Sequence, residues 1–448
     1  MKPLNTLFAA TAALLIATTP TLAQQNSTIG SPAGVGSSGS ASVGSAAADS
    51  AEAAAMAALY TPGLNVFEAP KQTAAFTGIH LDWHAAFAQG FQSLDHSNRA
   101  AATAGKLQPL RRGLNLAMAN LSLGAQLARG VRVDLESYMS SRHHEEFWVK
   151  GGYATIDASP IDVPVLNRIM EYTTIKAGHY EVNYGDAHYR RSDGGYTIRN
   201  AFVENYILDA FTTEIGGEVM VRKGPGFVIA GVTSGENKGD VKQSAVKARP
   251  AFVGKIGFDD SLSETVRVRL TGSTYLVSST PGTTLYGGDR TGSHYFGVME
   301  KEGYVETDQF TSGRVNPGFR NELSAFQINP FIKFGGLELF GVLEKSSGKA
   351  VAEATRRHVS QYAGDVVYRF LDDKLYLGGR YNVVDGDLSL TATNVSVKRA
   401  ALSGGWFLTP NLLTKVEYVN QKYDGFAVTD IRNGGKFHGL MIEGAIGF

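Results

Sequence analysis

The residues with the greatest chemical potential in this sequence are charged side chains gathered between residues 184 and 210. Acids, bases and a histidine follow one another there at short spacing: Asp186, His188, Arg190, Arg191, Arg199 and Glu204. Guanidinium groups hold carboxylate and phosphate oxygens through paired, charge-assisted hydrogen bonds. This stretch therefore predicts a loop that selects small solutes by charge. The alternative is an ordinary solvated surface loop.

Arginines also alternate with apolar residues elsewhere in the chain. Arg267 and Arg269 stand between Val266, Val268 and Leu270. Successive side chains of a β-strand point to opposite faces, so one face of this segment is charged and the other is apolar. Such a strand suits a wall with water on one side and lipid on the other.

Histidines raise the question of a metal site. His80 and His84 lie four residues apart on one strand face, a separation of about 13 Å that is too large for one shared ion. The run from His143 to Glu146 could bind a cation weakly, and we interpret it as solvated polar residues. We therefore expect no metal and no other cofactor.

The sequence lacks the local motifs of common enzyme classes. It contains no nucleophile elbow, phosphate-binding loop or zinc-protease helix motif, and it has no cysteine for thiolate chemistry. We predict that the protein is not an enzyme. A hydrolase remains an alternative, because a catalytic triad assembles in space rather than in sequence.

Composition narrows the class of fold and partner. The chain of 448 residues has 42 Lys and Arg and 42 Asp and Glu, so it lacks the positive surplus that nucleic-acid binding requires. It contains 52 Gly, 19 Tyr and 23 Phe but only 14 Pro. This composition favours strands and turns over helices.

The N-terminal part is organised like that of an exported protein. A positive start and a short apolar run from Leu7 to Thr19 precede small residues that end at Ala23. This pattern predicts a signal peptide over residues 1–23. Residues 24–77 are rich in Ala, Gly and Ser, and we expect them to form a flexible segment.

Residues 78–448 alternate between apolar and polar side chains. At the start of this region, Leu81 and Trp83 alternate with Asp82 and His84. We count about 16 such segments, joined in turn by short and long connections, as in porin-sized barrels. The predicted fold class is all-β: a transmembrane antiparallel β-barrel of about 16 strands, with short periplasmic turns and long outer loops.

Three connections carry specific predictions. The stretch from Tyr184 to Ala210 is charged and ends in an aromatic-rich part, and we predict that it folds inward as the pore constriction. The stretch from Thr280 to Asn321 is longer, and we expect it to cap the mouth from outside. Residues 158–171 form a long connection where a short turn is expected, and Ile161 to Met170 are predicted to make a helical turn there.

The alternation also predicts which charges face the lumen. The basic set is Arg132, Lys176, Arg267, Arg269, Lys333, Arg369, Arg380, Arg399 and Lys415. The acidic set is Asp82, Asp134, Glu136, Glu338, Glu344, Asp365, Glu417 and Glu443. Nine bases against eight acids predict no strong ion preference, with some charges paired across neighbouring strands.

One region resembles a known protein family. A strand, Ile175-Lys176-Ala177-Gly178-His179-Tyr180, continues into Glu181-Val182-Asn183-Tyr184-Gly185, and Phe202-Val203-Glu204 and Thr213-Glu214-Ile215-Gly216-Gly217 follow. These motifs resemble the strand, the constriction loop and its return into the wall in the phosphate-selective porin family. The resemblance implies passive diffusion of small solutes, phosphate among them, through a homotrimeric barrel.

The last alternating strand closes on Phe448, and a terminal aromatic resembles the assembly signal of outer-membrane barrels. We therefore predict a protein of the cell outer membrane that contacts outer-membrane lipid and the barrel assembly machinery. The predicted function is a porin-like passive diffusion channel for small polar or anionic solutes. The alternatives are an occluded outer-membrane barrel with a structural or adhesive role, and an outer-membrane hydrolase.

Overall fold

The computed structural model describes residues 65–72, 76–115, 117–140, 147–193, 197–238, 241, 243–305 and 310–448. The predicted signal peptide, most of the predicted flexible segment and the run from His143 to Glu146 lie outside the described residues. No helix in the described part is long and apolar enough to cross a lipid bilayer.

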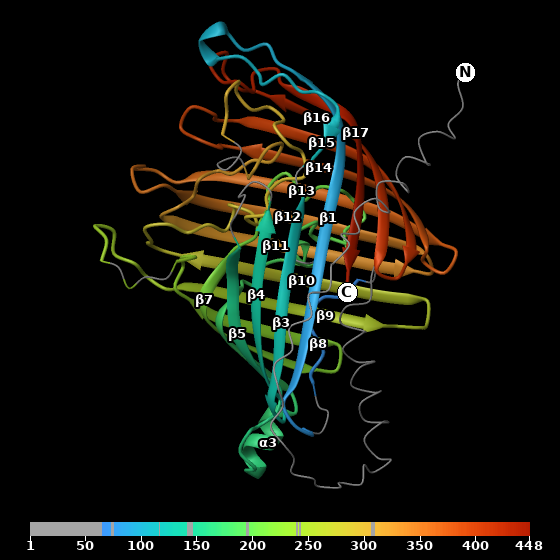
Figure 1. Cartoon of the computed structure of the whole chain (residues 1–448). Helices are drawn as coiled ribbons and strands as arrows, with labels where there is room; N and C mark the ends of the chain where they lie inside the picture. Colours follow the sequence, from blue (N-terminus) through green and yellow to red (C-terminus); the bar gives the residue numbers. More distant parts are fainter. Residues whose placement is uncertain are drawn as a thin grey trace, which may run out of the picture. The chain divides into compact units, whose positions relative to one another are not determined.

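The described residues form one antiparallel sheet of seventeen strands (Figure 1). One of them, β2 (Gly113–Leu114), is a two-residue piece that pairs with β1 shortly before β3 begins. The sixteen long strands are β1 (His80–Ser97), β3 (Met118–Ala128), β4 (Val131–Ser140), β5 (Trp148–Ile156), β6 (Thr173–Glu181), β7 (Thr213–Lys223), β8 (Gly226–Thr233), β9 (Ala251–Ser261), β10 (Val266–Val277), β11 (Glu322–Phe334), β12 (Leu337–Lys349), β13 (Arg357–Phe370), β14 (Leu375–Gly386), β15 (Val395–Thr409), β16 (Leu412–Asp424) and β17 (Lys436–Gly447).

The sheet closes because both edges of β1 are paired. Residues Ala86–Ser97 of β1 pair with β17, and residues His80–Ala88 pair with β3. Each of the other long strands pairs with the strands before and after it, so the described sheet has no open edge. The predicted all-β antiparallel barrel of about 16 strands is confirmed.

Alternation along each strand separates a charged interior from an apolar exterior. In β10, Leu270 is 52% exposed, whereas Arg269 beside it is 1% exposed. In β14, Leu377 and Tyr381 are exposed and Arg380 is buried. Because neighbouring strand residues point to opposite faces, the apolar side chains form the outer surface and the charges point into the barrel.

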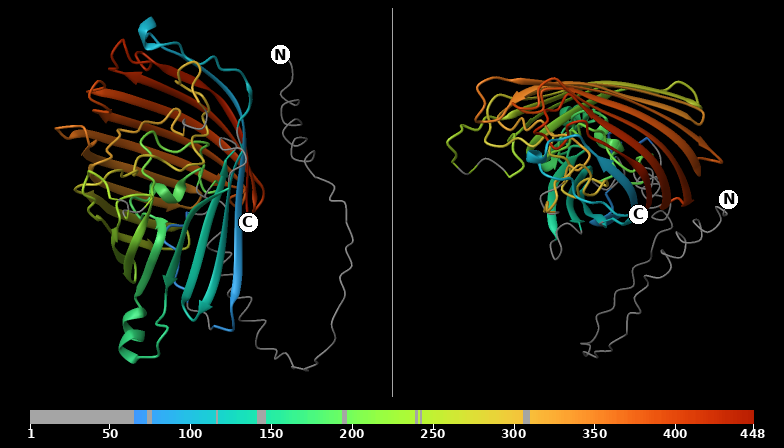
Figure 2. Two further views of the ribbon diagram at one scale, coloured as in Figure 1. Left: turned by 60° about the vertical axis from the view of Figure 1, so that its left-hand side comes forward. Right: turned by 90° about the horizontal axis from the view of Figure 1, so that it is seen from above.

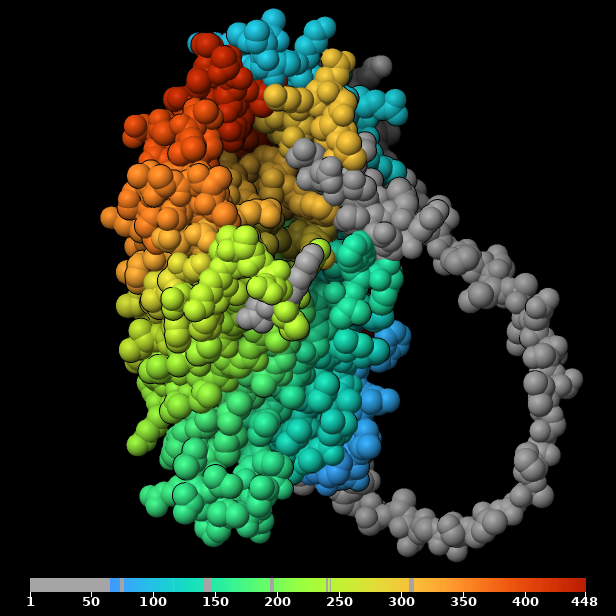
Figure 3. Space-filling view, turned by 90° about the vertical axis from the view of Figure 1, so that its left-hand side faces the viewer, coloured from blue at the N-terminus to red at the C-terminus, as the bar shows by residue number. Residues whose placement is uncertain are grey.

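The connections at the two ends of the barrel differ. Tight hairpins lie at the end where β1 begins and β17 stops, which we call the turn end, and the longer connections lie at the opposite loop end. One turn-end connection carries α3 (Pro164–Met170), so the helical turn predicted within Ile161 to Met170 is confirmed. In Figure 3, α3 projects at the bottom of the barrel and the amber residues near 300 lie towards the top.

Two loop-end connections fold into the barrel (Figure 2, right). We call the described residues within 182–212 the first inner loop and the described residues within 278–321 the second inner loop. Side chains of both loops belong to one buried cluster, with Ile207 of the first loop and Val298 of the second completely buried. The hydrophobic core of the protein therefore lies inside the barrel.

The expectation that the second inner loop caps the mouth from outside is wrong. Its aromatic residues enter the lumen because their hydroxyl groups find buried acceptors on the wall. The hydroxyl of Tyr286 donates to Glu344 of β12 (2.8 Å), and that of Tyr295 donates to Glu417 of β16 (2.5 Å). The rings are thereby removed from water without leaving a polar group unpaired.

Candidate functional site

Polar side chains of the wall hold the backbone of the first inner loop. The amide of Val203 donates to Glu417 of β16 (2.8 Å). The amide of Ile207 donates to Asn382 of β14 (2.7 Å). A buried backbone outside helices and sheets needs such partners. Wall side chains therefore fix an irregular loop across the lumen.

Asp186 anchors the start of this loop. Its carboxylate accepts two hydrogen bonds from Arg269 of β10 (2.8 and 2.9 Å) and one from Lys255 of β9 (3.1 Å). Burial alone would raise the pKa of Asp186, but the charges of Lys255 and Arg269 outweigh burial and hold the pKa below its usual range. Asp186 is therefore ionised and bound to the wall.

The three loop arginines lie in different surroundings. Arg191 is buried and donates to Asp193 (2.6 and 2.9 Å) and to Asp209 (2.8 Å). Arg190 is buried with its guanidinium 4.7 Å from the ring centre of Phe340. Arg199 is half-buried and lines a cavity at the turn end. The structure therefore keeps the charge of Arg191 neutralised and leaves Arg199 as the loop arginine beside a cavity.

His188 and Glu204 have structural partners as well. His188 lies 2.5 Å from Glu181 through Nδ1, and burial lowers its pKa despite that carboxylate. Glu204 accepts hydrogen bonds from the hydroxyl of Ser293 and the amide of His294, both at 2.6 Å. Because Ser293 and His294 belong to the second inner loop, Glu204 joins the two loops.

Most of the predicted lumen bases are paired with carboxylates. The pairs are Arg132 with Asp134 (3.0 Å), Lys176 with Glu218 (3.6 Å), Arg267 with Asp259 (2.8 Å), Arg269 with Asp186 (2.8 Å), Lys333 with Asp373 (3.8 Å), Arg369 with Glu338 (2.7 Å), Arg380 with Asp365 (2.7 Å) and Lys415 with Glu443 (2.7 Å). Arg399 instead donates to one carbonyl of each inner loop, Asn205 (2.7 Å) and Gly313 (2.6 Å). Most of these bases are therefore neutralised by neighbouring carboxylates, and Arg269 and Arg399 hold the inner loops.

The sequence analysis missed several lumen bases, among them Lys150 of β5 and Lys255 of β9. Both are buried, and the neighbouring Val149 and Ile256 are exposed on the outer face. The same alternation that identified the other lumen bases contains the signal for these two.

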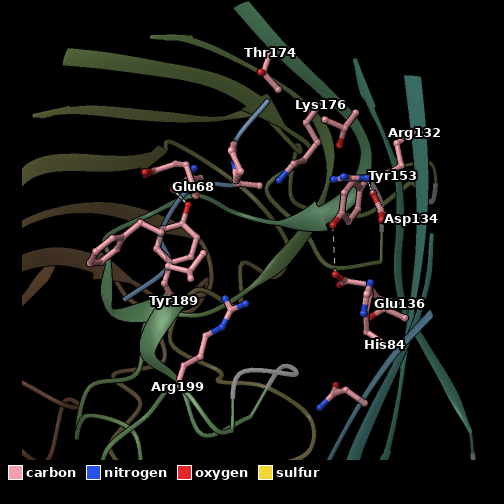
Figure 4. A pocket seen from close by; sticks show the side chains of 18 of the residues that line it. Glu68, His84, Arg132, Asp134, Glu136, Tyr153, Thr174, Lys176, Tyr189 and Arg199 are labelled. Carbon is pink, nitrogen blue, oxygen red and sulfur yellow. Dashed lines mark hydrogen bonds and ion pairs between the residues drawn. The ribbon is translucent and has the colours of Figure 1, made fainter. Parts of the chain in front are cut away.

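A cavity of about 210 Å³ lies at the turn end (Figure 4). Figure 4 shows Arg132, Asp134 and Glu136 on one side of it, with Glu68 and Tyr189 on the opposite side. Among the described lining residues, the bases are Arg132, Lys176 and Arg199 and the carboxylates are Glu68, Asp134, Glu136, Asp157 and Glu218. Carboxylates therefore outnumber bases in the turn-end cavity.

A second cavity, of about 340 Å³, lies further along the same wall towards the loop end. Strands β4, β5 and β6 line both cavities. The described charged residues of the loop-end cavity are Lys150, Lys238, Asp289 and Arg290, and its aromatic residues are Tyr138, Trp148, Phe211 and Phe310. This cavity is therefore basic and aromatic, in contrast to the turn-end cavity.

Lys150 lies between the two cavities. It forms an ion pair of 2.5 Å with Asp289, which lines the loop-end cavity. Its charge also interacts with Glu136, which lines the turn-end cavity. Both members of the Lys150–Asp289 pair are buried, so a fixed charge of each sign lies on the wall between the two cavities.

A short segment before the barrel also enters the lumen. Residues 65–72 were assigned to the flexible segment in the sequence analysis, but Phe67 is 5% exposed and Glu68 forms ion pairs with the wall. The available signal was slight: Phe67 is the single Phe between Phe8 and Phe76, and an acid follows it directly.

Comparisons with known proteins identify the fold. No family model matches the chain, and no curated protein matches it. An anion-selective porin from Comamonas acidovorans matches with a TM-score of 0.51 at 10% identity, over 83% of this chain and 100% of that chain. This similarity shows that the chain has the barrel fold of outer-membrane porins.

Two further solved structures match less closely. The trimer form of OmpT from Vibrio cholerae has a TM-score of 0.49 at 9% identity, over 83% of this chain and 100% of that chain. The outer-membrane channel DcaP of Acinetobacter baumannii has a TM-score of 0.48 at 11% identity, over 84% and 100%. The resemblance to the phosphate-selective porin family stays a prediction.

Proposed function

We propose that the protein is an outer-membrane channel for the passive diffusion of small polar or anionic solutes. The observation that carries this proposal is the pair of cavities along β4, β5 and β6, which occupy one wall of a closed barrel and are separated by Lys150 and Asp289. A porin-sized barrel encloses an aqueous lumen that inward-folded loops narrow.

The charges along this wall suggest how solutes are selected. Lys150, Lys238 and Arg290 would attract anions to the loop-end cavity, where aromatic side chains offer apolar surface. A carboxylate or phosphate group at Lys150 can then move on to Lys176 and Arg199, which line the turn-end cavity. The Comamonas porin with the same fold is described as anion-selective, which agrees with this direction. Phosphate is one anion that these bases could pass.

The proposal includes the cellular setting. The apolar outer surface of the strands fits contact with outer-membrane lipid. Export by a signal peptide over residues 1–23, insertion by the barrel assembly machinery and a homotrimer belong to the same proposal. The mass of the detergent-solubilised protein, measured by light scattering, tests the trimer.

Single-channel recording tests the channel. The refolded mature protein is placed in a planar bilayer, and the current and reversal potential are measured under a salt gradient. Stable current steps with a reversal potential on the anion side are expected. Folded, heat-modifiable barrels that never conduct would contradict the proposal.

An occluded barrel with a structural or adhesive role is the second candidate. It is favoured by the depth to which the inner loops fill the lumen, since Asn382, Gln421 and Lys415 of the wall are completely buried beneath them. Conductance separates the two candidates, because an occluded barrel gives no current steps while its loops stay in place.

A further inference from the structure

Glu68 occupies an anion site on the inner wall. Arg269 holds its carboxylate with both terminal nitrogens, each at 2.8 Å. Lys255 and Arg222 lie 3.5 and 3.4 Å from the same carboxylate. The side chain of Glu68 is 4% exposed. The paired contact with Arg269 is the geometry in which guanidinium groups recognise carboxylates.

Phe67 fills an apolar position next to that anion site. Its ring centre lies 4.1 Å from the guanidinium carbon of Arg269. The ring makes edge contacts with Tyr189 and Phe331, at centre separations of 5.9 and 5.5 Å. Phe67 and Glu68 together therefore present a carboxylate and an attached apolar group to one pocket of the wall.

The wall carries a surplus of positive charge at this place. We call its four bases the basic cluster: Arg222, Lys255, Arg267 and Arg269. Besides Glu68, the carboxylates paired with the cluster among the described residues are Asp186 and Asp259. Without Glu68 the cluster would hold four positive charges against two negative ones. Lys255 and Arg269 are buried, and buried charge that is only partly balanced is costly, so a vacated cluster would take up an anion from solution.

Displacement of residues 65–72 would break no strand pairing of the described sheet. They lie outside the strands of the sheet, and Ala69 and Pro70 are exposed. The segment runs between the turn-end cavity and a further cavity of about 210 Å³, and residues Phe67–Pro70 line both. Its other described anchors are few. The carbonyl of Asn65 accepts from Arg267 (2.8 Å), and the amide of Gln72 donates to Asp157 (3.2 Å). The side chain of Asn65 accepts from Arg190, and Lys71 donates to the carbonyls of Met170 (2.6 Å) and Thr173.

We propose that residues 65–72 are a tethered competitor for a carboxylate-binding site formed by the basic cluster. When Phe67 and Glu68 are displaced, the site binds a small carboxylate that carries an apolar group. This inference names the class of solute and the segment that competes with it. Its meaning for transport rests on the proposed channel function.

Benzoate binding to the refolded full-length mature protein in detergent tests the site without requiring conductance. The test variant is Phe67→Ala/Glu68→Gln, which removes both groups and keeps the chain length. The matched control is Glu264→Gln, which removes one exposed carboxylate from a hairpin at the same end of the barrel. Isothermal titration calorimetry measures the affinity, and heat-modifiability on gels verifies folding.

The double variant should bind benzoate at least about tenfold more tightly than the unmodified protein, because a tethered competitor acts at a millimolar effective concentration. The control should bind like the unmodified protein. Adding Arg222→Ala, at the half-buried edge of the cluster, should weaken the gain. If the double variant does not fold, Glu68→Gln alone should show a smaller gain in the same direction.

Equal affinities in the unmodified protein and the folded variants would overturn the proposal, and so would no binding by any folded variant. Acetate used in place of benzoate should bind more weakly, because it leaves the Phe67 position empty. The single-channel current of the same proteins is measured in a planar bilayer as a separate experiment. If binding follows the expected order but no variant conducts, the competitor site stands and the channel proposal fails.

Discussion

At the scale of single residues, Lys150 is the base best placed to set ion preference. It lies between the two cavities, and its partner Asp289 is buried beside it at 2.5 Å. Other lumen bases, such as Arg369 and Arg380, are buried in pairs that line neither described cavity. A charge that lines a cavity acts on an ion in that cavity more strongly than a charge that lies further away, because Coulomb energy falls with distance.

Replacing Lys150 by Gln should shift the reversal potential towards cations, because Asp289 is then left as the fixed charge between the cavities. A change of roughly twofold in the permeability ratio, equivalent to about 0.4 kcal/mol, is a conservative expectation for one unit charge near a pore. The measurement is the reversal potential under a salt gradient. Lys374→Gln, at an exposed hairpin, is the control and should leave the potential unchanged.

Acid should loosen the contact between the inner loops through Glu204. Burial alone would raise the pKa of Glu204, but the attraction of Arg314, followed by that of His294 and Arg399, lowers it to about 2 from an ordinary 4.5. A carboxyl whose pKa is lower in the folded protein contributes stability above its unfolded pKa and loses it as the pH falls towards the folded pKa.

The conductance of the channel should therefore change between about pH 4.5 and pH 2, as Glu204 releases Ser293 and His294. The measurement is the single-channel current over this range. Glu204→Gln should remove this change, because glutamine carries no charge to lose. A Glu204→Gln channel with the same acid response as the unmodified protein would show that another group controls it.

At the scale of elements, the strands were predictable, whereas the path of the second inner loop was not. In a strand such as β10, successive side chains alternate between the two faces of the sheet. This alternation can be recognised in the sequence without knowing which strands lie beside it. The lumen position of Arg267 and Arg269 follows from this alternation alone. The inward fold of the second inner loop does not follow from this alternation. Tyr286 and Tyr295 are held in the lumen by hydrogen bonds to carboxylates of strands that are distant in the sequence.

The segment 65–72 escaped prediction for a related reason. Its surroundings are dominated by Ala, Gly and Ser, which predict disorder on average. Two side chains, Phe67 and Glu68, are enough to dock it because the wall supplies a ring-lined pocket and Arg269. The average composition of a long segment does not show that two of its residues bind to side chains elsewhere in the chain.

The closing strand β17 carries a prediction at the same scale. Phe448 exchanges backbone hydrogen bonds with Ala85 of β1 (2.8 and 2.9 Å), and its ring packs edge-on against Trp83 with centres 6.1 Å apart. Phe448→Ala keeps the backbone bonds and removes the ring. If the ring is an assembly signal, the variant should reach the outer membrane at sharply lower yield and still refold in detergent.

The control for this prediction is Phe448→Tyr, which keeps an aromatic ring on the outer surface and should restore the yield. Heat-modifiability after refolding and the amount of protein in isolated outer membranes are measured side by side. Loss of refolding together with loss of yield would assign the ring a role in closing the barrel rather than in recognition by the assembly machinery.

At the scale of the whole barrel, the charges of the two cavities differ in sign. The loop-end cavity has Lys150, Lys238 and Arg290 against Asp289 among its described lining residues, whereas carboxylates outnumber bases in the turn-end cavity. The two cavities therefore give the inner wall a fixed dipole along its length. The difference in charge between the cavities arises only when the chain folds, because residues far apart in the sequence supply the charges of each cavity.

Such a pore should rectify current. Anions are concentrated at the basic loop end and depleted at the turn end, so current should be larger at the polarity that drives anions from the loop end to the turn end. Rectification should be clear at about 0.1 M salt, where the Debye length is about 10 Å, and weak at about 1 M, where it is about 3 Å. Arg290→Gln removes a base that lies beside Trp148 at the loop end, so it should reduce the asymmetry. Currents equal at both polarities in dilute salt would show that solutes do not pass along the wall formed by β4, β5 and β6.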